Sequence, residues 1–93
     1  MVNGVFAFSG TKIEGRVLGK TLEGAFTHKL PIPALIDPAH YKFAKFSDLT
    51  GKFRGHVKGG QLSITYNKGG ATITGKVNEG HHTIDFEGET RVL

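Results

Sequence analysis

Basic side chains occupy every second position of one short segment in this 93-residue chain. The four residues are Lys52, Arg54, His56 and Lys58. Alternate residues of a β-strand lie on the same face, so the four side chains are predicted to share the outer face of one strand. A row of cations with no acid between them attracts phosphates or carboxylates. The pattern therefore predicts a binding surface.

The basic character extends to the segment before this strand, where Lys42 and Lys45 lie. Residues 40–68 carry six basic residues and one aspartate, whereas the formal net charge of the whole chain is +4. We predict a non-catalytic binding module whose partner is anionic, either an acidic protein surface or nucleic acid. The predicted contact residues are Lys42, Lys45, Lys52, Arg54, His56 and Lys58.

An acidic stripe mirrors this pattern near the end of the chain, where Asp85, Glu87 and Glu89 alternate with Phe86 and Gly88. Two interpretations remain open. The stripe pairs with the basic row of another copy and forms a homo-oligomer, or its charges keep an edge strand from pairing with other chains.

A second set of residues suits a different function, a small-ligand or carbohydrate site at loop tips or at the mouth of a barrel. Its members are His28, Tyr41, Tyr66 and His82. An enzyme is less favoured, because the sequence has no paired histidine spacing typical of metal sites and no nucleophile motif. We therefore predict no catalytic residue, metal or cofactor. A self-assembling structural component, such as a virion protein, is a further alternative.

The element that positions these residues is a strand built around a central glycine. The repeat runs apolar, polar, glycine, polar, apolar, as in 13–17, 22–26, 49–53 and 73–77. Strand parity places each glycine on the inward apolar face, which suits a sharply curved sheet. The prediction is one all-β domain over 1–93, a small antiparallel meander barrel or strongly bent sandwich of six to eight strands. The expected strands are 3–8, 11–18, 21–29, 48–58, 61–67, 71–78 and 82–92.

One long connection contains all three prolines of the chain. Asp37 followed by Pro38 is typical of a helix start, with aspartate as the cap and proline in the first turn. Phe43 and Phe46 then follow at helical spacing. We predict a short helix over 38–46 that covers an end of the barrel or packs beside it.

Cysteine is absent, which excludes disulfides and thiolate chemistry. The first residues lack the basic and apolar regions of a signal peptide, and no apolar run is long enough to span a membrane. A cytoplasmic location is the expectation.

Overall fold

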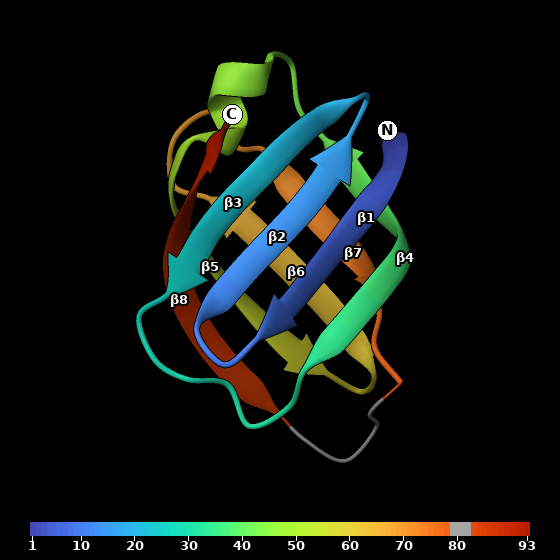
Figure 1. Ribbon diagram of the computed structural model, residues 1–93, viewed down its shortest axis with the longest axis vertical. Helices are drawn as coiled ribbons and strands as arrows, with labels where there is room; N and C mark the ends of the chain where they lie inside the picture. The colour runs from blue at the N-terminus through green and yellow to red at the C-terminus, as the bar shows by residue number, and fades with distance from the viewer. Residues whose placement is uncertain (79–82) are drawn as a thin grey trace.

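The computed structural model describes residues 1–78 and 83–93. Eight antiparallel strands close into a barrel (Figure 1), which confirms the predicted all-β barrel. The strands are β1 (Val2–Ser9), β2 (Lys12–Val17), β3 (Lys20–Phe26), β4 (Ala34–Lys42), β5 (Gly51–Lys58), β6 (Gln61–Tyr66), β7 (Thr72–Lys76) and β8 (Ile84–Val92). Seven of them match expected strands, and β4 is additional.

The order of strands around the barrel is β1-β2-β3-β8-β5-β6-β7-β4. The runs β1–β3 and β5–β7 are hairpin meanders, as predicted; Figure 1 shows the first in front of the second. In a simple meander β4 would lie between β3 and β5, and β8 would lie between β7 and β1. In this barrel the positions of β4 and β8 are exchanged. Each half of the chain is therefore a Greek key, in which the fourth strand returns to lie beside the first.

The predicted helix over 38–46 is wrong. Residues Ala34–Lys42 form β4, and the helical element nearby is a single 3-10 turn, η1 (Phe46–Leu49). The alternation of β4 explains the difference, because Ala39 and Tyr41 are both fully buried while Lys42 is exposed. Burial against the barrel outweighs the local helix signal. Within the described part of the chain, no helix is long and apolar enough to cross a membrane.

A β-bulge allows proline inside β4. The pairing of β1 with β4 shifts register between Gly4, which faces Ala39, and Phe6, which faces Ile36. Pro38 lies at this irregularity and is exposed. Proline is tolerated at bulges because the ladder needs no amide donor there.

Apolar side chains fill the barrel interior. Phe26 is central, with its ring 5.4 Å from Phe8 and 4.9 Å from Phe86 in edge-on contacts. The inward glycines let neighbouring strands approach closely. A Cβ built on Gly24 would lie 2.1 Å from the carbonyl oxygen of Glu89 on β8. The glycine positions therefore determine how tightly the sheet curves.

Candidate binding surface

The four basic residues of β5 lie on the outer face of the barrel, as strand parity predicts. Lys52, Arg54 and His56 are exposed, whereas Phe53 and Val57 between them are buried in the core. Lys58 is exposed at the end of the strand. The strand therefore presents its cations to solvent and its apolar side chains to the interior.

The acidic stripe lies directly beside this basic row, because β8 pairs with β5. Lys52 faces Glu89 and His56 faces Asp85 in the register. Arg54 faces Glu87, and its Nε lies 3.6 Å from the Glu87 Oε2. These six residues form one surface, which we call the charge ladder. The sequence shows both stripes but not their contact, since β6 and β7 separate β5 from β8 along the chain.

On its other edge, β5 pairs with β6, which pairs with β7 and then β4. Arg54 faces Thr65, Thr65 faces Thr72, and Thr72 faces Lys42. Side chains paired in this way point to the same side of the sheet. One row across four strands therefore carries a cation at each end and two hydroxyls between them.

A second row lies two residues away along the strands. His56 faces Ser63, Ser63 faces Thr74, and Thr74 faces His40. The His40 Nδ1 lies 3.1 Å from the Asn3 Oδ1 on β1, which orients this imidazole. The second row repeats the arrangement of the first, with ionisable rings at its ends and hydroxyls in its centre.

A third row consists of Lys58, Gln61 and Lys76. None of the outward side chains on β5, β6 and β7 is a carboxylate. We call this surface the basic face; it comprises His40, Lys42, Lys52, Arg54, His56, Lys58, Gln61, Ser63, Thr65, Thr72, Thr74 and Lys76. The outward serine and threonine residues of β6 and β7 and Lys76 were not predicted from the sequence. Residues 61–66 and 72–76 nevertheless show the same alternation of inward apolar and outward polar positions.

Lys45 lies off the strands that make the basic face. It is exposed and precedes η1, where its backbone N–H donates to the Asp48 carboxylate over 3.3 Å. Of the six predicted contact residues, the strand register brings five together: Lys42, Lys52, Arg54, His56 and Lys58.

The two tyrosines of the alternative ligand set are core residues. The Tyr41 hydroxyl donates to the Val5 carbonyl oxygen over 2.7 Å. The Tyr66 hydroxyl bonds with the Thr90 hydroxyl, which itself donates to the Leu49 carbonyl oxygen over 2.8 Å. Burial raises the pKa of Tyr66 to about 12 and raises the pKa of Tyr41 further. Both hydroxyls therefore stabilise the barrel and stay neutral at physiological pH.

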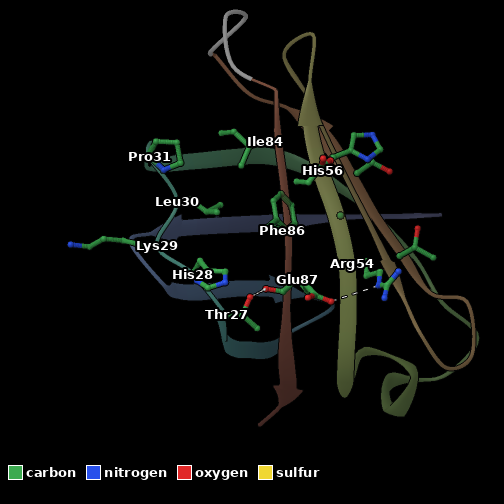
Figure 2. A pocket seen from close by; sticks show the side chains of 14 residues that line it. Thr27, His28, Lys29, Leu30, Pro31, Arg54, His56, Ile84, Phe86 and Glu87 are labelled. Atoms are coloured by element: carbon green, nitrogen blue, oxygen red, sulfur yellow. Dashed lines mark hydrogen bonds and ion pairs between the residues drawn. The ribbon is translucent and has the colours of Figure 1, made fainter.

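His28 is exposed and lines a cleft of about 680 Å³ that runs from the β3–β4 connection across β8 to β5 and β6. Four residues of the basic face also line this cleft: Arg54, His56, Ser63 and Thr65. Figure 2 shows His28 and Leu30 on one side of β8 and Arg54 on the other. Phe86 contributes an apolar side chain to the cleft lining. His82, the last member of the alternative set, lies outside the described residues.

Among the described residues, no group of three or more histidine, aspartate or glutamate side chains is arranged to hold a metal ion. Comparisons with protein-family models, curated proteins and solved structures found no match for this chain.

Proposed function

We propose that the protein is a non-catalytic binding module whose basic face binds an acidic surface of another protein. The observation that supports this is the charge of β5, β6 and β7, whose outward side chains include Lys52, Arg54, Lys58 and Lys76 and no carboxylate. Cations provide long-range attraction, and the threonine and serine hydroxyls between them donate hydrogen bonds to carboxylate oxygens.

The shape and chemistry of the face favour an acidic protein over single-stranded nucleic acid. Sequence-tolerant binding of single strands uses exposed aromatic rings on which bases stack. The outward positions of β5, β6 and β7 carry no phenylalanine, tyrosine or tryptophan, and Tyr41 and Tyr66 are buried. The face thus supplies charge and hydrogen-bond donors without a stacking platform.

Lys42 and Lys76 are the residues that test this proposal best. Both are exposed on the basic face, and neither belongs to the charge ladder, where Lys52, Arg54 and His56 already face carboxylates. The double variant Lys42→Glu/Lys76→Glu reverses one charge in the first row, on β4, and one in the third row, on β7.

The experiment measures binding of the protein to poly-glutamate at several salt concentrations. We expect binding that weakens steeply with salt and a loss on the order of tenfold in the double variant. The matched control is Lys12→Glu/Lys20→Glu, which makes the same charge change on exposed positions of β2 and β3. Equal losses in both variants would show that net charge alone drives binding, and would reject the basic face.

Single-stranded and duplex DNA form the second arm of the same titration. If the protein prefers DNA to poly-glutamate at the same salt concentration, the partner is nucleic acid and not an acidic protein. Absence of binding to both polyanions at low salt would overturn the proposal.

A further inference from the structure

The charge ladder combines two opposite rows in one register. Every outward residue of β5 from Lys52 to His56 is basic or a histidine, and each faces a carboxylate on β8. Neighbouring strands lie about 4.8 Å apart, and successive rungs lie about 7 Å apart along the strand. The ladder is therefore a small, regular array of charges, positive on one side and negative on the other.

The pairing within one copy leaves these charges accessible. Arg54 and Glu87 are the one rung within salt-bridge distance, at 3.6 Å, and their side chains are 78% and 62% exposed. Among the described residues, Lys52 and Glu89 form no salt bridge with each other, and all four remaining side chains of the ladder are exposed. The rungs can thus accept further charged partners without breaking a buried interaction.

The arrangement is complementary to itself. A two-fold axis parallel to the strands, midway between β5 and β8, places β5 of one copy over β8 of another. The rotation leaves each residue at the same height along the strand direction. Each cation of one copy therefore meets the carboxylate of the equivalent rung in the other copy. Lys52 would face Glu89 of the second copy, and Arg54 would face Glu87. Such isologous pairing is the commonest symmetry of protein dimers.

Small side chains flank the ladder on β6 and at its Glu89 end on β3, and the connection 27–31 lines a cleft beside its other rungs. On the β6 side the neighbours of the ladder are Ser63 and Thr65, and on the β3 side Ala25 faces Glu89. Thr27 follows, with its backbone N–H donating to the Glu87 carbonyl oxygen over 2.9 Å. The same two-fold axis brings β6 of one copy near β3 of the other, and small side chains lie on both.

We propose that the charge ladder is an interaction surface for a second copy of this chain. An acidic partner would be repelled by Asp85, Glu87 and Glu89, and a basic partner would be repelled by the β5 row. A partner with a basic row and an acidic row at the same spacing would place an opposite charge on every rung. A second copy of this chain has such a surface. Because exposed ion pairs contribute little each, the dimer is weak and is weakened further by salt.

The dimer surface and the basic face share Lys52, Arg54 and His56, so the two proposals are separated at the other end of the face. The dimer covers β5 and β8 but leaves Lys42, Thr72, Thr74 and Lys76 uncovered on β4 and β7. An acidic partner bound over β4 and β7 and a second copy bound over β8 can therefore occupy one molecule together.

Charge exchange tests the dimer directly. The variant Lys52→Glu/Arg54→Glu makes the ladder wholly acidic apart from His56, and Glu87→Arg/Glu89→Lys makes it basic apart from Asp85. Sedimentation velocity is measured for the wild type, each variant, their equal mixture and the fourfold exchange variant. We expect the wild type to self-associate at low salt and each variant alone to associate on the order of tenfold more weakly. The mixture should form a heterodimer, and the fourfold variant should regain self-association.

All altered side chains are exposed, and circular dichroism checks that each variant keeps the fold. A wild type that stays monomeric at low salt, or a mixture that fails to associate, would overturn the dimer. Lys42→Glu/Lys76→Glu should self-associate like the wild type while losing poly-glutamate binding. Failure of the dimer and failure of the basic face are thereby distinguished.

Discussion

Tyr41 and Tyr66 use their hydroxyl groups inside the barrel, where each has a protein partner. Within the described residues, every buried side-chain nitrogen or oxygen has a hydrogen-bond partner. Buried polar groups stabilise a fold when they are paired and destabilise it strongly when they are not. The bond between Tyr66 on β6 and Thr90 on β8 could not be predicted from the sequence, because these two strands are not consecutive.

Alkaline pH should destabilise the protein through these tyrosines. Burial raises the pKa of Tyr66 to about 12, from about 10 in an exposed tyrosine, and it also raises the pKa of Tyr41. Above pH 10 the unfolded chain releases these protons while the folded chain keeps them, which favours unfolding. The free energy of unfolding, measured with urea, should therefore be constant with respect to these groups below about pH 10 and fall between about pH 10 and 12.

The variant Tyr66→Phe separates this effect from lysine titration, which all variants share. It should be about 1 kcal/mol less stable at neutral pH, because the hydrogen bond between the Tyr66 and Thr90 hydroxyls is lost. Its stability should also fall less steeply above pH 10. An unchanged alkaline slope in a Tyr41→Phe/Tyr66→Phe variant would contradict the assignment.

Among the secondary-structure elements, the sequence predicts those strands whose formation depends on the local pattern of residues. Alternation and glycine turns identified both three-stranded meanders, and these carry the β5, β6 and β7 rows of the basic face. The strand β4 was missed because Asp37 and Pro38 resemble a helix start. The bulge that accommodates Pro38 depends on pairing with β1, which local sequence does not encode.

The inward glycines make a sharp prediction for β3. Gly24 has a negative-φ backbone, but its Cβ would lie 2.1 Å from the Glu89 carbonyl oxygen, so Gly24→Ala must push β3 away from β8. We expect a loss of about 2 kcal/mol or more in the free energy of unfolding, as for other overpacked sites. The control Ala25→Thr alters an exposed neighbour on the same strand and should change stability by less than about 0.5 kcal/mol. Equal stability of the two variants would mean that β3 and β8 are less closely packed.

Neighbours that come from distant parts of the chain could not be predicted. The strand β8 lies beside β5 because it returns to the first strand of its half, and β4 lies beside β7 where the two halves pair to close the barrel. Both candidate surfaces depend on these contacts. The charge ladder needs Arg54 beside Glu87, and the hydroxyl rows need Lys42 beside Thr72. Parity gave the outward direction of each side chain, and topology supplies its neighbours.

For the whole molecule, charge is divided among the strands of the barrel wall. The strands β5 to β7 carry outward cations and hydroxyls, while β8 carries the acidic row that bounds them. On the opposite wall, Glu14 faces Glu23 between Lys12 and Arg16, so acids and bases are mixed there. The basic face is therefore the region where an anionic partner meets the least repulsion.

We propose that the partner engages the basic face over β4 and β7, outside the cleft that His28 lines. An NMR titration of the isotope-labelled protein with poly-glutamate tests it residue by residue. We predict that amide shifts at low salt concentrate on Lys42, Thr72, Thr74 and Lys76, and disappear as salt is added. Shifts concentrated in the connection Thr27–Pro31 and on Phe86, or spread evenly over the barrel, would contradict the claim.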